Sequence, residues 1–286
     1  MKSVGDKYIL PGQSDHERLR VISEIHDGAT RELLNLAGLK RGSSFMEFGC
    51  GLGYVTRWAA AQGADAAGID VNDEQVNASI ALAKHEDVKA DFRIGSIYEP
   101  KCEPNSIDLA YSRWLMVHLS RPVDAMRAIL GILKPGGVMV CEEAGAGQVY
   151  AEPRSPAYEE MRDIALKAGH ARGVDYDGGR YAHLWAREAG FDLVHAAAYH
   201  PHYLSGPHKG FWNWTLRNAT KSLVEEGTMT QQRWQELVDG MTAADSDPGT
   251  VVAHCRMHQL IARKPLNREA NDSVINGKAG WKSSHK

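Results

Sequence analysis

The sequence has 286 residues, of which 43% are hydrophobic and 24% are charged, and its formal net charge is −3. This is the composition of a soluble globular protein, long enough for one large α/β domain or two small ones. The slightly acidic balance, without a basic run interleaved with aromatic residues, argues against a nucleic-acid partner. No stretch approaches the ~20 apolar residues of a membrane span, so we expect no membrane partner.

The N-terminus, Met-Lys-Ser-Val-Gly-Asp-Lys-Tyr, lacks the apolar core of a signal peptide. Four cysteines are scattered along the chain without a C-x-x-C pair. This pattern predicts reduced thiols, with neither a zinc site nor a disulfide framework. We therefore expect a cytoplasmic protein that holds no metal.

Two helices are expected before the first strand. Ser14 and Glu17 have the spacing of a capping box, which predicts the start of a helix. A second helical pattern begins at about Thr30 and stops near Gly38.

A strand, a glycine turn and a helix follow one another in residues 45–61. Glu47 is the one acidic residue of an apolar run, and Gly49, Gly51 and Gly53 alternate in the turn after it. Such a turn lets a ligand approach backbone N–H groups at a helix N-terminus. Glycines there remove Cβ atoms that would block the ligand, and they permit positive φ angles.

The glycine spacing does not favour a dinucleotide. The G-x-G-x-x-G/A fingerprint would put its third small residue at position 54, which is Tyr54. A pyrophosphate also gains little from an acidic residue just before the turn, so a cationic ligand without phosphate fits better. An NAD-dependent oxidoreductase is therefore the weaker alternative.

The run Glu47-Phe-Gly-Cys-Gly-Leu-Gly53 resembles the first motif of class I S-adenosylmethionine (SAM)-dependent methyltransferases, and the later Leu-Lys-Pro-Gly-Gly is also typical of them. The resemblance covers residues 40–145 well. It implies a doubly wound α/β fold, a Rossmann-like seven-stranded sheet of order 3-2-1-4-5-7-6 in which only strand 7 is antiparallel. It also implies SAM as cofactor, with Glu47 and the three glycines along its amino-acid and ribose parts. The alternative is an ordinary turn with packing glycines.

Two further strand ends are expected to bind the cofactor. Asp70 follows an apolar run, and its two carboxylate oxygens match the vicinal diol of a ribose; Val71 lies beside it. The alternative for Asp70 is a helix-capping acid, although Asn72 also suits the cap of the next helix. The third strand, 88–94, ends at Ser96 and Ile97, which the resemblance places at the adenine. The resemblance would also let Tyr8 lie over SAM. The alternative is a tyrosine that anchors its segment to the protein surface.

The fourth strand, 105–112, carries Asp108, which the resemblance marks as a buried structural carboxylate. The next residues lack the Asp/Asn-Pro-Pro-Tyr/Phe motif of many DNA, RNA and protein amine methyltransferases. They resemble the small-molecule branch instead, with Arg113 near the cofactor and Trp114 near the acceptor. His118 is the best-placed proton acceptor, because its ordinary pKa lies near neutrality. A capping or packing histidine is the alternative.

The fifth strand, 138–141, ends in Glu142 and Glu143. Strand alternation lets only one of them face the site, so we expect the other to be solvated. Either Glu142 or Glu143 could orient His118 or take the proton, and Glu142 is our second catalytic candidate. Two acidic residues that are adjacent in the sequence cannot hold a metal ion by themselves.

Helices are expected at 155–170, at 181–189 and, broken near Gly227, within 216–241, with strands from 190 and at 250–261. A cluster of aromatic and imidazole side chains could line a pocket for a flat acceptor. Its members in our assignment are His200, His202, Tyr203 and Trp212. The alternative is the packed underside of a lid helix.

The predicted organisation has three parts. Residues 1–40 form a helical cap, residues 41–265 form the SAM-binding domain with lid insertions at 150–190 and 205–248, and residues 266–286 form a polar mobile tail. The expected function is methyl transfer from SAM to an O, N or C atom of a small molecule of secondary metabolism. A SAM-fold protein without methyl transfer, for example a pericyclic catalyst, is the alternative. A homodimer is also open.

Overall fold

The computed structural model describes residues 13–266. Tyr8 and the predicted tail after Leu266 lie outside these residues. No helix in 13–266 is long and apolar enough to cross a bilayer.

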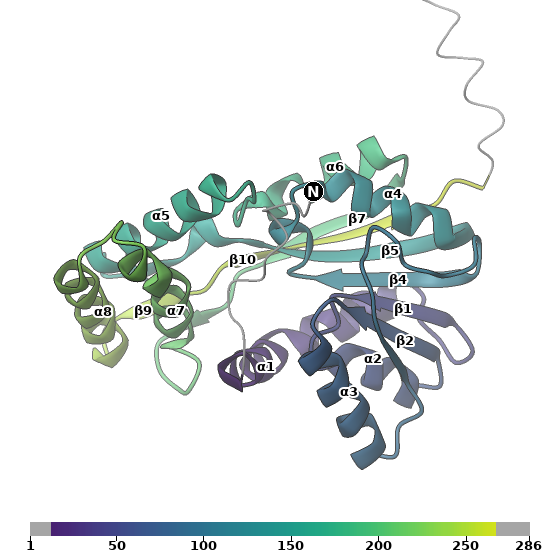
Figure 1. The fold of residues 1–286 in the computed structure, drawn as a ribbon, viewed down its shortest axis with the longest axis horizontal. Coiled ribbons are helices and arrows are strands. Elements are labelled where there is room, and N and C mark those ends of the chain that lie inside the picture. The colour runs from purple at the N-terminus through teal and green to yellow at the C-terminus, as the bar shows by residue number, and fades with distance from the viewer. Residues whose placement is uncertain (1–12, 267–286) are drawn as a thin grey trace, which may run out of the picture.

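A seven-stranded sheet forms the centre of the molecule (Figure 1). Its strand order is β3-β2-β1-β4-β5-β10-β7, and β10 runs antiparallel to both of its neighbours while the other pairs are parallel. The predicted fold and strand order are thus confirmed. The strands are β1 (Ser44–Phe48), β2 (Asp65–Asp70), β3 (Asp91–Ile94), β4 (Ile107–Arg113), β5 (Leu133–Gly145), β7 (Asp192–Tyr199) and β10 (Arg256–Arg263).

Helices cover both faces of this sheet (Figure 1). On one side lie α1 (Gln13–Leu36), α2 (Tyr54–Ala61) and α3 (Asp73–His85), and on the other α4 (Pro122–Ile132) and α6 (Ala182–Ala189). Alternation along β1 explains the two layers: Phe45 packs with α1 and α2, whereas Met46 and Phe48 pack with α4. Each face of the sheet therefore has its own core.

Between residue 13 and β1 the chain forms one long helix, α1, so the prediction of two helices is wrong. The helix passes through Gly28, which is exposed and has no heavy atom near the position of a Cβ. An exposed glycine costs a helix only about 1 kcal/mol relative to alanine. Thr30 is fully buried and bonds to residues of the sheet rather than capping a helix.

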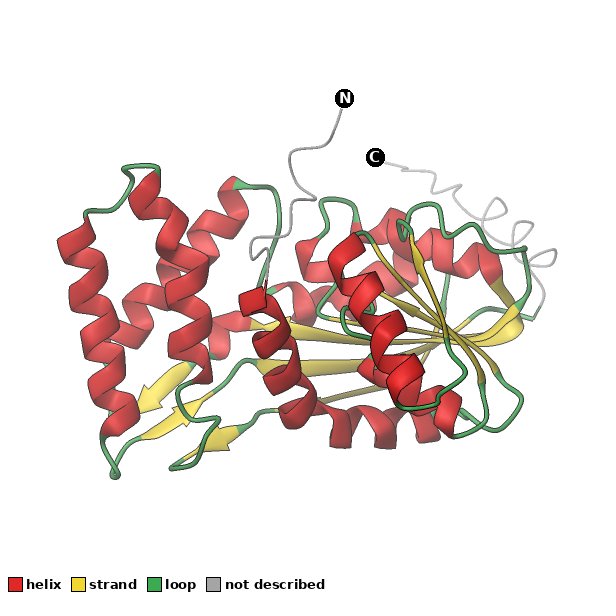
Figure 2. Ribbon diagram, turned by 60° about the horizontal axis from the view of Figure 1, so that its bottom comes forward, coloured by secondary structure: helices red, strands yellow, loops and turns green. Residues whose placement is uncertain are grey.

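A second cluster of elements lies beyond one end of the sheet (Figures 1 and 2). It contains α5 (Pro156–Ala171), α7 (Phe211–Glu225), α8 (Gln231–Ser246) and a small sheet of order β6-β9-β8 that the sequence did not predict. Its strands are β6 (Tyr150–Glu152), β8 (His202–Tyr203) and β9 (Val251–Ala253). The predicted break near Gly227 separates α7 from α8. The expected last strand is divided into β9 and β10.

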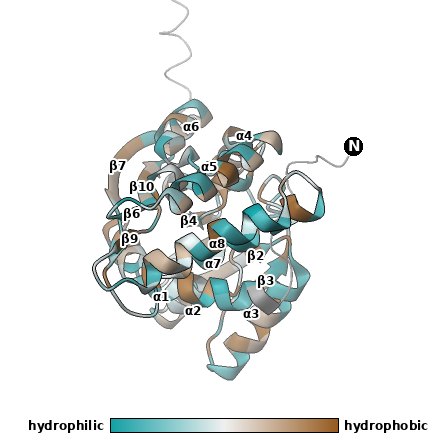
Figure 3. Cartoon of the chain, turned by 90° about the vertical axis from the view of Figure 1, so that its left-hand side faces the viewer, coloured by the Kyte–Doolittle hydropathy of each residue, from teal (hydrophilic) through white to brown (hydrophobic). Residues whose placement is uncertain are grey.

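Viewed from this end, the outer side of α8 is mainly hydrophilic (Figure 3). The inward residues Leu237, Val238 and Met241 are buried and pack with α5 and α7. The three helices therefore share a hydrophobic core with α1, the small sheet and the ends of β5 and β10.

Two predictions about acidic residues are wrong. Glu142 and Glu143 are both fully buried, because β5 continues to Gly145 and is covered there on both faces. The Asp108 side chain is 41% exposed rather than buried, although its role is structural: Lys134 forms an ion pair with it at 2.8 Å and the Ser44 backbone N–H donates to it.

Candidate active site

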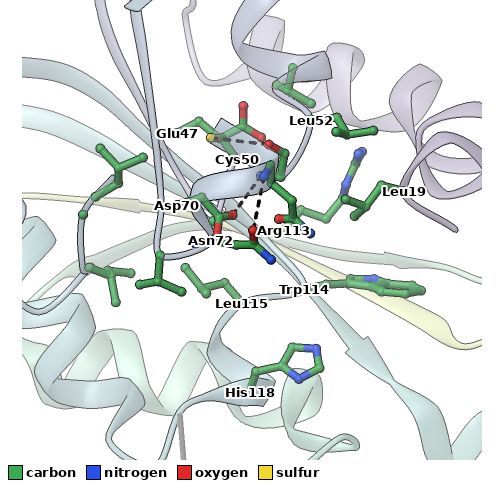
Figure 4. A pocket seen from close by; sticks show the side chains of 18 of the residues that line it. Leu19, Glu47, Cys50, Leu52, Asp70, Asn72, Arg113, Trp114, Leu115 and His118 are labelled. Carbon is green, nitrogen blue, oxygen red and sulfur yellow. Dashed lines mark hydrogen bonds between the residues drawn. The ribbon is translucent and has the colours of Figure 1, made fainter. Parts of the chain in front are cut away.

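A pocket of about 230 Å³ lies at the carboxyl ends of β1, β2 and β4 (Figure 4). We call it the first pocket. It brings together most of the cofactor residues predicted from the sequence. These are Glu47, Gly49, Gly51, Asp70, Val71, Ser96, Ile97 and Arg113.

Asp70 is fixed at the end of β2 by two backbone groups. The N–H of Gly51 donates to its Oδ2 and that of Asn72 to its Oδ1, each at 2.9 Å. Each carboxylate oxygen can still accept another hydrogen bond, as the binding of a ligand diol requires. Burial raises the pKa of Asp70 above its usual range. Asn72, rather than Asp70, caps α3 by accepting the N–H of Gln75, as predicted.

Glu47 lies at the end of β1 and is buried. Its Oε2 accepts the backbone N–H of Thr56 at 2.8 Å and also the Thr56 hydroxyl. Burial raises the pKa of Glu47 to about 7, although the bonds from Thr56 oppose the rise. Glu47 therefore joins β1 to α2 and presents an acidic group to the pocket.

Arg113 connects the end of β4 to α1. Its Nη1 forms an ion pair with Asp27 at 2.9 Å and donates to the Thr30 hydroxyl at 2.9 Å. The guanidinium is nearly buried, yet it lines the first pocket. It supplies a fixed positive group opposite the acids.

Trp114 has a φ of +54°, which is unusual for a bulky residue and costs free energy. Its backbone N–H donates to the Glu142 carbonyl at 2.9 Å, and its indole N–H lies 2.8 Å from the Met257 sulfur. These contacts hold the strained residue at the wall of the pocket. Backbone strain of this kind is common in functional sites.

His118 ends the short helix η2 (Met116–His118), which follows β4. Glu143 accepts the backbone N–H groups of Leu115, Met116 and Val117 at 3.2, 2.9 and 3.4 Å, and so fixes this turn. Burial, assisted by the charge of Arg18, lowers the pKa of His118 to about 4. The imidazole is thus neutral at neutral pH and can accept a hydrogen bond.

A family model described as a methyltransferase domain matches residues 17–196. The chain belongs to this methyltransferase family. Membership confirms the predictions of a class I SAM-dependent methyltransferase and of SAM as its cofactor.

Two relatives and one solved structure illustrate the similarity. An uncharacterised methyltransferase of Schizosaccharomyces pombe is 28% identical over 62% of this chain and 68% of its own. A 24-methylenesterol C-methyltransferase of rice (Oryza sativa subsp. japonica) is 32% identical over 54% of this chain and 42% of its own, so the chain spans under half of that relative. A putative sarcosine dimethylglycine methyltransferase of Galdieria sulphuraria has the same fold, with a TM-score of 0.54, 15% identity and coverage of 88% and 87% of the two chains.

A second pocket of this methyltransferase, about 100 Å³ in volume, adjoins the first. We call it the second pocket. Arg18, Trp114 and His118 line both pockets. The remaining lining comes from η2, the end of β5, α5, α7 and the residues Ala146 and Tyr176, and it is mainly apolar.

Several predicted site residues lie elsewhere. Glu142 lines neither pocket, because its carboxylate bonds to Thr30, Tyr111 and Gln259 inside the protein; its catalytic assignment is therefore not supported. Gly53 does not line the first pocket either. A Cβ there would lie 2.4 Å from the Phe92 ring, so the glycine permits packing of α2 against β3.

The predicted acceptor cluster is divided. Trp212 lines the second pocket, whereas His202 and Tyr203 form strand β8 of the small sheet and His200 lies just before it; these three residues line neither pocket. His202 bonds to Tyr150 at 2.9 Å, and the His200 ring nitrogen lies 2.6 Å from the His254 carbonyl. Within residues 13–266 no group of three potential ligands could hold a metal.

Sequence reasoning missed the residues that α1 contributes. Arg18, Leu19 and Ile22 line the first pocket from this helix, and Gln75 lines it from α3. The Asp15 carboxylate forms an ion pair with Arg18 at 2.8 Å and bonds to the Gln75 amide, which ties α1 to α3. A helical pattern alone does not show which of its polar residues will face a ligand.

Proposed function

We propose that this methyltransferase transfers the methyl group of SAM from the first pocket to a small organic acceptor in the second pocket. The observation that carries the proposal is the wall that the two pockets share, formed by Arg18, Trp114 and His118. A donor and an acceptor bound on either side of it would meet there. Holding two reactants in this way is the main contribution that a protein makes to a displacement.

The residues of the first pocket fit SAM. Asp70 has the free accepting capacity for ribose hydroxyls, and the backbone turn at Gly49 and Gly51 carries no side chain that would exclude a ligand. The acids Glu47 and Asp70 suit a ligand that carries a sulfonium and an ammonium group. Arg113 supplies a positive group for its carboxylate.

Bound SAM supplies an electrophilic methyl group, whose bond to sulfur breaks as the bond to the acceptor atom forms, leaving a neutral thioether. The side chains position the acceptor and exclude water. Neutral His118 accepts a hydrogen bond from an O–H or N–H of the acceptor and takes this proton as the methyl group is transferred, and Glu143 holds the turn on which His118 lies.

We also propose that residues 1–40 and the two insertions, 150–190 and 205–248, act as a cap and a lid. The support is that α1 lines the first pocket and that α5 and α7 line the second. Helix α6 lies within the first insertion but packs with α4 on the main sheet. A homodimer, a cytoplasmic location and a role in secondary metabolism stay predictions.

The test is incubation of the purified protein with SAM and a panel of small acceptors, followed by mass spectrometry. Methyl transfer predicts S-adenosylhomocysteine (SAH) and a methylated product in equal amounts. Conversion of an acceptor to an isomer without SAH release would show a SAM-fold catalyst that transfers no methyl group.

A further inference from the structure

Two residues of helix α7 that carry polar side-chain groups, Trp212 and Thr215, line the second pocket. Trp212 and Thr215 are three residues apart, so they share one face of the helix with Leu216 and Ala219. The Trp212 indole nitrogen and the Thr215 hydroxyl are buried, and neither has a hydrogen-bond partner among residues 13–266. A buried donor without a partner is costly, so the two atoms mark a place where a ligand oxygen would be stabilised.

The charged residues of the second pocket are all basic. Arg18 and Arg162 line it, and no aspartate or glutamate does. Both guanidinium groups have carboxylate partners outside the lining, Asp15 at 2.8 Å and Asp163 at 2.8 Å. The first pocket differs, because Glu47 and Asp70 line it together with Arg18 and Arg113.

The rings of Trp114, Trp212 and Tyr176 also line this pocket, and such rings can attract a cation. An ammonium group there would face two guanidinium groups and would lose its water without gaining an acidic partner. A neutral molecule avoids both costs and still packs against the rings.

We propose that the acceptor is a neutral, ring-bearing molecule with an oxygen that accepts hydrogen bonds from the indole N–H of Trp212 and the hydroxyl of Thr215. This inference rests on the function proposed above and adds the class of acceptor. Trp212 and Thr215 line only the second pocket, so the oxygen that they hold is not the atom that is methylated. They set specificity and take no part in the transfer itself. The pocket volume, about 100 Å³, suits about one six-membered ring.

Three probes of nearly equal shape test the proposal in the presence of saturating SAH. They are acetophenone, α-methylstyrene, in which a methylene replaces the carbonyl oxygen, and the cation 1-phenylethylammonium. Affinities are measured by ligand-observed NMR titration. We expect acetophenone to bind about fivefold more tightly than α-methylstyrene, and the cation to bind more weakly than either.

The Trp212→Phe, Thr215→Val double variant should bring the affinities of acetophenone and α-methylstyrene within about twofold. Its SAH affinity should not change. Trp214→Phe, on the same helix but outside the pocket lining, is the matched control and should keep the preference. Thermal unfolding of each variant checks that it is folded.

Equal or tighter binding of the ammonium probe would overturn the proposal. So would a preference for acetophenone that survives in a folded double variant, or no binding of acetophenone to the SAH complex. Failure of the wild-type protein to bind SAH would overturn the proposed function itself, and this inference with it.

Discussion

The carboxylate of Glu143 accepts the backbone N–H of Met116 at 2.9 Å, and so joins β5 to the turn that carries His118. Leu115 and Val117 donate to the same carboxylate. Three N–H groups directed at one acidic side chain fix the backbone of η2. Glu143 is therefore a positioning residue, whereas its neighbour Glu142 stabilises the interior on the α1 side of the sheet.

Glu143→Gln should lower turnover about tenfold or more while SAH affinity changes little. The amide has one accepting oxygen, and its NH₂ group would face a backbone N–H, so the turn would lose its alignment. Steady-state kinetics and calorimetry measure the two effects. Asp108→Asn, on the remote end of β4, is a control that should leave both unchanged. An equal loss of turnover and SAH affinity would contradict the positioning role.

The same substitution should change how stability depends on pH. Burial raises the pKa of Glu143 to about 7, whereas its ordinary value is 4.5. Between these values the folded state binds more protons than the unfolded state, so the contribution of Glu143 to stability falls as the pH rises. The free energy of unfolding of the wild type, minus that of Glu143→Gln, should fall by up to about 3 kcal/mol from pH 4.5 to pH 7.5. Urea unfolding at several pH values measures it, and a constant difference would be the contrary result.

His118 should contribute no pH dependence to the activity of the wild type near neutrality. Burial lowers its pKa to about 4, so the imidazole stays in its neutral, accepting form from pH 6 to pH 8 and is protonated only near pH 4. We expect kcat/KM to show no loss assignable to His118 between pH 8 and pH 6, and His118→Ala to lower kcat about a hundredfold. His183→Ala, exposed on α6, is the control. A decline centred near pH 6.5 that His118→Ala abolishes would contradict this account.

Gly53→Ala should destabilise the fold. Its φ is +68°, and the new Cβ would lie 2.4 Å from the Phe92 ring, so strain and overpacking add to about 2–4 kcal/mol. Gly51→Ala is the comparison: its φ of +53° carries similar backbone strain, but its Cβ would meet the flexible end of the Leu19 side chain at 3.2 Å and no aromatic ring. Thermal unfolding should show the larger loss for Gly53→Ala, and Phe92→Leu should restore part of it. Equal losses in both variants would contradict the packing role of Gly53.

The features predicted best from the sequence are those that depend on neighbouring residues. The glycine turn, Asp70 at the end of β2 and the Asn72 cap are all local, because the backbone N–H groups that fix them lie within a few residues or on the adjacent turn. The strand order followed from the family resemblance. These residues meet at one edge because parallel strands end together.

The predictions that were wrong concern features that depend on contacts between distant segments. Glu142 is buried by contacts with α1 and β10, and Glu143 by contacts with η2. The residues that bond to them there, Thr30, Gln259 and Met116, are more than 20 residues away in the sequence. His200 and His202 were grouped with Trp212 because they are close in sequence, but the chain turns between them into the small sheet. Arg18 of α1 and Thr215 of α7 carry no local sign that they face a pocket.

The most direct test of the account is calorimetric titration of the purified protein with SAH, SAM and NADH, repeated with Asp70→Asn. We expect SAH and SAM to bind with micromolar affinity, about −8 kcal/mol, and NADH not to bind. Asp70→Asn should weaken SAH binding at least about tenfold, because a charged acceptor of ligand hydroxyls is lost. Asp73→Asn, which removes an exposed charge on the first turn of α3, should bind SAH like the wild type. Wild-type protein that binds neither SAM nor SAH, or an Asp70→Asn variant that binds SAH unchanged, would contradict the central claim that the first pocket holds the cofactor.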